Sequence, residues 1–137
     1  GVAFEYDSRS VLVDDFDLDG RQDLLVSQLD STSRRDVESL HLYRNVWEEN
    51  GNCIGFCLRP GGGMSAMGTR ITIESAMGKQ SAVIVNGDSF YTQHSTTRLF
   101  GLGKDTHVRK ATITWPNGKT TIMEHPKINE YHVVKTD

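Results

Sequence analysis

The sequence predicts an all-β protein in which about ten short strands follow one another at roughly ten-residue spacing. Three observations support this fold class. Short segments carry apolar residues at every second position, as strands with one buried face do. Clusters of Gly, Pro, Asn and Asp separate these segments and predict turns. No segment shows a convincing period of 3.6 residues, which an amphipathic helix requires. The pattern is typical of a small β-sandwich or barrel.

The N-terminal third of the chain reads as strands on both sides of an acidic loop. The apolar runs Val11-Leu12-Val13 and Leu24-Leu25-Val26 flank that loop. Polar segments before and after them are expected to be turns or exposed loops. The strands are therefore expected at residues 1–6, 11–13, 24–29 and 40–45, with a turn at 7–10 and a loop at 30–38.

The rest of the chain shows the same alternation with stronger turn signals. Pro116-Asn117-Gly118 between two alternating segments predicts a hairpin, because Pro and Asn-Gly suit a tight connection. The glycine-rich segment 60–68 lacks the Lys-Ser/Thr of a phosphate-binding loop, so we expect a flexible connector between the two parts of the chain. Strands are expected at residues 53–58, 70–74, 81–85, 98–100, 111–115, 120–124 and 131–134.

Length and charge narrow the possible functions. The 137 residues fit one domain, or a small domain with an appended motif. The formal charge of −3 is localised, because residues 14–23 are rich in Asp and hold only one base, Arg21. The remainder is close to neutral, so no basic face indicates a nucleic-acid or anionic-membrane partner. No apolar stretch approaches the ~20 residues of a membrane span. Gly1 in place of Met suggests a processed product or a fragment.

The acidic loop carries the clearest chemical signal. Asp occupies every second position from residue 15 to 19, Gly20 follows, and a further Asp comes three residues later. Such dense carboxylates repel one another unless a cation lies between them, and Ca²⁺ prefers oxygen ligands. Gly20 supplies the sharp turn that lets the loop wrap an ion. The expected ligands are the side chains of Asp15, Asp17, Asp19 and Asp23 and the carbonyl of Arg21.

The acidic loop has two other possible interpretations. An EF-hand needs a bidentate Glu at its twelfth position, which here is Val26 inside an apolar run, and its flanks should be helices. The sequence instead predicts a strand–loop–strand site. The remaining alternative is a solvated acidic turn that binds no ion.

No catalytic site is expected. The histidines are scattered without zinc-site spacing, and no Gly-x-Ser-x-Gly segment is present. Cys53 and Cys57 lie four residues apart in a predicted strand, a span of ~13 Å that excludes a disulfide unless a bulge at Gly55 brings them together. We therefore expect two small residues on one face of a strand.

A polar and aromatic segment before the strand at 98–100 is a second candidate site. Aromatic rings stack on sugar rings, and amide groups hydrogen-bond to hydroxyls, so this segment is a candidate for glycan binding through Tyr91, Gln93, His94 and Arg98. The alternative is that Phe90 and Tyr91 only anchor a long loop.

Several segments resemble known families. The string from Asp15 to Val26 resembles the calcium loop of FG-GAP/VCBS repeats, which build blades of integrin-like β-propellers, and residues 42–45 resemble the end of such a blade. Segments 68–71, 98–103 and 114–119 are similar, in order, to the ASPIC/UnbV domain that follows those repeats in cartilage acidic protein-like secreted proteins.

The resemblance implies a calcium-loop hairpin or partial propeller blade over residues 1–46, followed by a small β-sandwich or barrel-like domain over 47–137. It also implies an extracellular, cell-surface or periplasmic setting, a structural or adhesive role, and no enzymatic activity. One blade cannot close a propeller. Hence residues 1–46 either pack on the second domain, belong to a longer chain, or pair with other subunits in a filament. The alternative function is a carbohydrate-binding accessory domain of a secreted protein.

Overall fold

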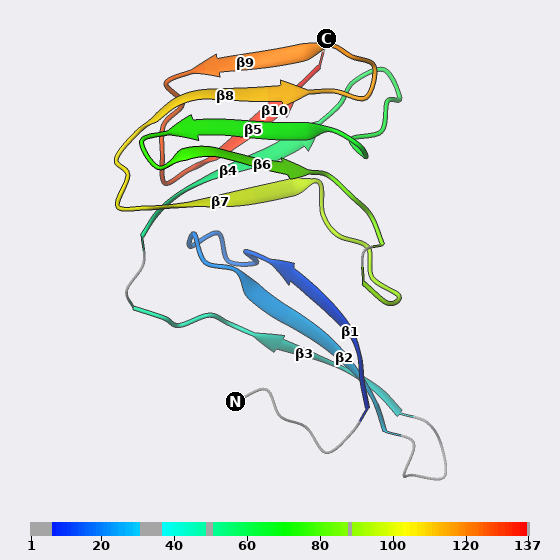
Figure 1. The fold of residues 1–137 in the computed structure, drawn as a ribbon. Helices are drawn as coiled ribbons and strands as arrows, with labels where there is room; N and C mark the ends of the chain where they lie inside the picture. The colour runs from blue at the N-terminus through cyan, green and yellow to red at the C-terminus, as the bar shows by residue number, and fades with distance from the viewer. Residues whose placement is uncertain (1–6, 31–36, 49–50, 88, 137) are drawn as a thin grey trace.

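The computed structural model describes residues 7–30, 37–48, 51–87 and 89–136. The described residues form ten strands in three sheets and no helix, which confirms the all-β prediction (Figure 1). Accordingly, they include no helix of the length and apolar character needed to cross a membrane. The strands are β1 (Asp7–Asp14), β2 (Asp23–Asp30), β3 (Val37–Tyr43), β4 (Asn52–Arg59), β5 (Arg70–Ser75), β6 (Gly78–Val83), β7 (Thr97–Gly103), β8 (Val108–Thr114), β9 (Thr120–Glu124) and β10 (Tyr131–Lys135).

The N-terminal sheet is an antiparallel meander in the order β1-β2-β3. Its strands extend further than expected, because Asp7–Ser10 belongs to β1 and residues 37–39 belong to β3. The predicted turn at 7–10 is therefore wrong. Pairing with β2 overrides the local turn preference of these polar residues, and a register shift between Ser8 and Ser10 absorbs the extra residue Arg9. The strand expected at 1–6 lies outside the described residues.

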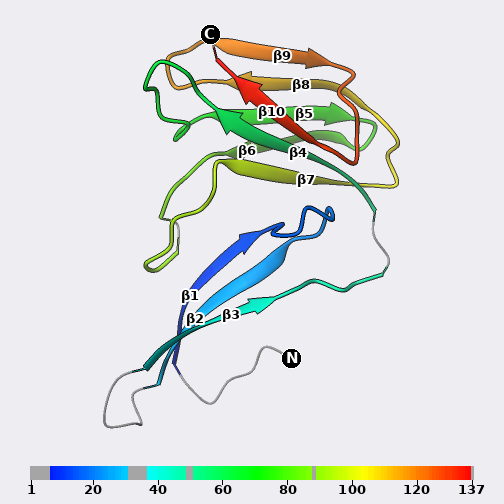
Figure 2. The same ribbon diagram turned by 180° about the vertical axis from the view of Figure 1, so that it is seen from behind.

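The C-terminal part is a two-sheet sandwich. One sheet has the order β10-β4-β7 and the other β6-β5-β8-β9 (Figure 2). Neither sheet closes on itself, so the predicted sandwich is confirmed and the predicted barrel is wrong. Alternate residues of both sheets meet in a shared apolar core that includes Ile54 and Phe56 from β4, Ile71 from β5, Leu102 from β7 and Ile113 from β8.

The segment 60–68 does not connect the two parts of the chain. It joins β4 to β5, and both of these strands belong to the sandwich. β4 is the central strand of its sheet, with β10 and β7 on either side. Ala66 is buried in the core, and the backbone amide of Gly68 donates to the carbonyl of Ile84 at 2.8 Å. The link from the N-terminal sheet to the sandwich instead runs between β3 and β4. Glycine content alone did not reveal this, because strand order depends on distant partners.

Two local predictions are confirmed in the sandwich. The hairpin β8–β9 pairs Thr114 with Thr120 across the predicted turn. Cys53 and Cys57 are free thiols in β4. The pairing of β4 with β7 is regular through Gly55, so no bulge shortens the distance between the two cysteines.

Candidate metal centre

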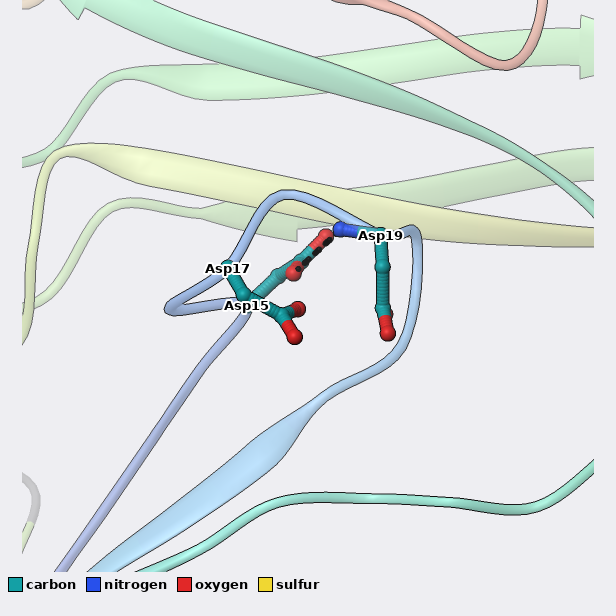
Figure 3. A group of neighbouring side chains, drawn as sticks. All are labelled: Asp15, Asp17 and Asp19. Atoms are coloured by element: carbon teal, nitrogen blue, oxygen red, sulfur yellow. Dashed lines mark hydrogen bonds between the residues drawn. The ribbon is translucent and has the colours of Figure 1, made fainter.

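The acidic loop joins β1 to β2 and brings three carboxylates together. Oxygen atoms of Asp15, Asp17 and Asp19 all lie within 4.8 Å of one another (Figure 3). The chain reverses here through two residues with positive φ, Leu18 at 59° and Gly20 at 86°. Glycine adopts that conformation without strain, which explains its place directly after the last Asp of the alternating series.

Asp15 is the buried member of the group, with 5% of its surface exposed. Its Oδ1 accepts a hydrogen bond from the backbone amide of Asp19 at 3.0 Å. Its Oδ2 accepts two, from the amide of Gly20 at 2.7 Å and from the hydroxyl of Tyr131 at 2.6 Å. Burial and the neighbouring Asp15 carboxylate raise the pKa of Tyr131, so this phenol keeps its proton and remains a donor.

Asp17 and Asp19 face solvent more than Asp15 does and are paired with two guanidinium groups. Arg44 reaches Asp17 Oδ2 at 2.6 Å and Asp19 Oδ2 at 3.2 Å, and Arg21 also pairs with Asp19. Desolvation alone would raise the pKa of Asp19. The hydrogen bond from the Arg21 amide and the charges of both arginines outweigh it and lower that pKa. Arginine side chains thus neutralise part of the charge of the loop.

Asp23 has a different structural role from the three grouped aspartates. It is 2% exposed and lies outside the three-carboxylate group. Its oxygens accept from the backbone amides of Phe16 at 3.1 Å and Asn45 at 2.7 Å. The Arg21 side chain adds a bond from Nε to the Asn45 carbonyl at 2.8 Å. Asp23 therefore fastens the loop to the end of β3, and metal ligation by Asp23 and by the Arg21 carbonyl stays a prediction.

The donor set fits a hard divalent cation. Every group in it offers oxygen, and neither nitrogen nor sulfur takes part. A carboxylate oxygen has two acceptor sites, so Asp15 Oδ1, which accepts one hydrogen bond from the described residues, has a second site for a cation. Asp17 and Asp19 can offer further carboxylate oxygens once their ion pairs with Arg44 and Arg21 are broken. The residues therefore fit a cation of the calcium or magnesium kind.

The second predicted site is only partly assembled. Tyr91 and Gln93 line a cavity of about 640 Å³ between the segment that precedes β7 and the N-terminal sheet. His94 and Arg98 do not line it; Arg98 lies in β7 and donates to the Thr97 carbonyl at 3.4 Å. Thr92 also lines the cavity, and its Oγ1 is buried without a hydrogen-bond partner among the described residues. No sequence pattern indicates this residue.

Sequence reasoning also missed two contacts of the acidic loop. Arg44 lies in the segment 42–45, which resembles the end of a blade, and the signal for its contact is its positive charge close to the acidic loop. Tyr131 had no such signal, since it lies 116 residues from Asp15 in the chain.

Comparison with known proteins identifies the C-terminal part. The family described as ASPIC and UnbV matches residues 60–137, which is more than half of the chain. Among curated proteins, the comparison found no match. The family match begins after β4, although β4 is the central strand of its sheet. It also leaves the acidic loop uncovered, so the likeness of that loop to an FG-GAP/VCBS repeat stays a prediction.

Proposed function

The chain belongs to the ASPIC and UnbV family, and from that premise we propose that it is a calcium-binding structural or adhesive module that works outside the cell or at its surface. The observation that supports this proposal most is the convergence of Asp15, Asp17 and Asp19 within 4.8 Å at the tip of the N-terminal sheet. Extracellular calcium is abundant, so a site of modest affinity is filled there. No catalytic group enters the proposal.

Calcium is preferred over magnesium for a geometric reason. Mg²⁺ demands a near-ideal octahedron, whereas Ca²⁺ accepts six to eight oxygens in irregular arrangements. The loop offers side chains with unequal exposure, from buried Asp15 to exposed Asp17, and a backbone that turns sharply at Gly20. Such a loop supplies main-chain carbonyls and admits water. The predicted ligands are the three Asp side chains, the Arg21 carbonyl and Asp23.

A bound cation would neutralise the charge of the carboxylates, and residues of the chain would hold the loop in place. Asp23 ties the loop to β3, while Asp15 ties its tip to the sandwich through Tyr131. Filling the site at a hundredfold excess over the dissociation constant would add about 2.7 kcal/mol to the free energy of unfolding by mass action. The site is therefore proposed as a clamp that holds the β1–β2 connection in one conformation.

Isothermal titration calorimetry and thermal melting with calcium or chelator test this function. The wild-type protein should melt at a higher temperature in calcium, and Asp17→Ala and Asp19→Ala should abolish that shift. Asp7→Ala is the matched control, because Asp7 is an exposed carboxylate of the same sheet that pairs with Arg9. An unchanged wild-type melting temperature in chelator would refute the proposal.

Self-association is the second element of the proposal. Among the described residues, the outer edges of β1 and β3 have no partner strand, and open edges favour pairing with another chain. Next to one edge, Leu40 and Leu42 are 70% and 59% exposed. We propose that copies of the chain assemble by pairing these edges into an oligomer or filament.

Size-exclusion chromatography with light scattering tests the assembly. Wild-type protein should elute above its monomer mass, and Leu40→Lys should return it to a monomer because a charged edge disfavours pairing. Met77→Lys, an exposed apolar residue of the sandwich, is the control. A wild-type monomer at micromolar concentration would contradict the assembly and leave the calcium proposal standing.

Glycan binding is the alternative function, favoured by the cavity beside the N-terminal sheet. The exposed ring of Tyr91 and the Gln93 amide suit a polyhydroxylated ligand. Glycan-array binding that Tyr91→Ala removes would support it. Phe90→Ala is the control, because this exposed neighbouring ring does not line the cavity. An array without binding would eliminate this alternative.

A further inference from the structure

The hydrogen bond between Tyr131 and Asp15 joins the sandwich to the acidic loop. From its geometry we infer that Tyr131 is a positioning residue of the cation site, so that cation binding and docking of the loop on the sandwich stabilise each other. This inference rests on the proposed calcium site and goes beyond it, because it places part of the site in the family domain at residues 60–137.

The sandwich makes room for the Tyr131 ring by leaving out one side chain. Tyr131 stands opposite Gly55 in the parallel pair of β10 and β4. A Cβ atom at Gly55 would lie 2.1 Å from Cδ1 of the Tyr131 ring, closer than any real contact. With any larger residue at position 55, the Tyr131 ring would have to shift, and its hydroxyl would move with it from the loop.

The backbone before Tyr131 is fixed by a second set of contacts. Asn129 has a positive φ of 59°, and its amide donates to the Cys53 carbonyl at 2.7 Å. Its side-chain oxygen accepts from the Cys53 amide at 3.0 Å. The Gly55 amide then donates to the Glu130 carbonyl at 3.1 Å. The start of β10 is therefore held on β4 independently of the loop, and the Tyr131 hydroxyl is presented by a rigid frame.

Counting acceptor sites shows what this hydroxyl does for the loop. Asp15 Oδ2 accepts from both Gly20 and Tyr131, which uses its two sites. Within the part of the chain that the structure describes, Oδ1 accepts from Asp19 alone, so the acceptor site left for a cation is on Oδ1. Tyr131 thus selects which oxygen is free and holds the carboxylate in that orientation. Groups that orient ligands in this way typically change metal affinity 10–100-fold when removed.

The same contact couples the two parts of the chain. If the Tyr131 bond raises the affinity of the loop for the cation, then the cation must strengthen docking of the loop on the sandwich by the same factor. An undocked loop would leave Asp15 without its fixed orientation. The relative placement of the N-terminal sheet and the sandwich would then depend on calcium concentration.

Calcium titration of the full chain by calorimetry tests this inference. Tyr131→Phe removes only the hydroxyl, and we expect calcium affinity to fall about tenfold or more. Tyr91→Phe is the matched control, because it removes a hydroxyl from a ring that is 88% exposed, and it should bind as wild type does. Gly55→Ala should weaken binding in the same way by displacing the ring.

Melting curves separate positioning from general stability. The inference predicts that Tyr131→Phe shrinks the rise in melting temperature produced by calcium. Wild-type binding together with equal binding by Tyr131→Phe would overturn the inference and leave the proposed function intact. An equal fall in melting temperature in calcium and in chelator, with unchanged affinity, would also overturn it, because Tyr131 would then be structural only. Absence of wild-type binding would overturn both.

Discussion

The C-terminal sandwich and the N-terminal sheet use different interactions to hold their strands. In the sandwich, apolar side chains from both sheets fill one core, and many of them are fully buried. In the N-terminal sheet, Val26 is the sole buried apolar residue among the described positions, and it is accompanied by buried Asp15, Asp23 and Gln28. A three-stranded sheet with so few buried apolar side chains gains little stability from hydrophobic burial.

This difference indicates where a bound cation would have most effect. The sandwich gains its stability from hydrophobic burial, which needs no ion. The N-terminal sheet instead uses carboxylates that accept hydrogen bonds from backbone amides, and Asp15 accepts a further one from Tyr131 of the sandwich. The proposed calcium site therefore lies in the part of the molecule with least independent stability, and that asymmetry can be tested by variants of each part.

The largest effect is expected in the sandwich core. Ile113→Ala removes a side chain that is 0% exposed, and the free energy of unfolding should fall by about 2–5 kcal/mol because a cavity remains. Ile122→Ala, on the neighbouring strand β9 and 51% exposed, should cost much less. Urea denaturation measures both. If the loss of unfolding free energy in Ile113→Ala depends on calcium, the sandwich is not independent of the ion, and the contrast between the two parts is wrong.

The next effect is local to the N-terminal sheet. Asp15→Ala leaves the Asp19 and Gly20 amides and the Tyr131 hydroxyl without their acceptor, at about 1–3 kcal/mol for each group that stays buried. Hydrogen exchange in chelator should therefore accelerate in β1 and β2 and stay unchanged in the sandwich. Asp17→Ala should have little effect, because Asp17 is exposed and bonded to Arg44. Equal acceleration in both parts would show that they unfold together.

Those features of the fold that depend on neighbouring residues could be predicted from the sequence. The hairpin around Pro116-Asn117-Gly118 follows from turn chemistry and alternation within a single segment. The acidic group was predicted in the same way, since Asp15, Asp17 and Asp19 are close in the chain and electrostatic repulsion between them needs compensation.

Features that depend on distant partners were missed. Asp7–Ser10 reads as a turn until β2 pairs with it, and the glycine-rich segment reads as a connector until β4 is placed between β10 and β7. The bond from Tyr131 to Asp15 needs the slot above Gly55, which exists only after β10 and β4 are paired in parallel. Strand order and register, which no local pattern encodes, decide these contacts.

A smaller effect is expected from Arg44, which competes with a cation for the same oxygens. Arg44→Ala frees Asp17 Oδ2 and removes one positive charge beside Asp19. Calcium affinity should therefore rise several-fold, while the stability of the metal-free protein should change little, because solvent screens an exposed ion pair. Calorimetry checks the first and urea denaturation in chelator the second. Arg9→Ala, which breaks an exposed pair with Asp7, should leave the affinity unchanged. Weaker calcium binding by Arg44→Ala would show that this arginine organises the site.

The smallest effect concerns pH and lies in the sandwich. The Ser75 hydroxyl beside Asp105, together with the Met77 amide that donates to it at 2.9 Å, lowers the pKa of Asp105. A pKa that is lower in the folded state means that the carboxylate stabilises the fold above its unfolded pKa of about 3.9, and this stabilisation is lost as pH falls through the folded pKa. Asp105→Asn should therefore lower the melting temperature slightly near neutral pH and make no difference in strong acid. Asp7→Asn, an exposed carboxylate of the N-terminal sheet, is the control. A difference for Asp105→Asn that grows on acidification would reverse the predicted sign and contradict a lowered pKa of Asp105 in the folded protein.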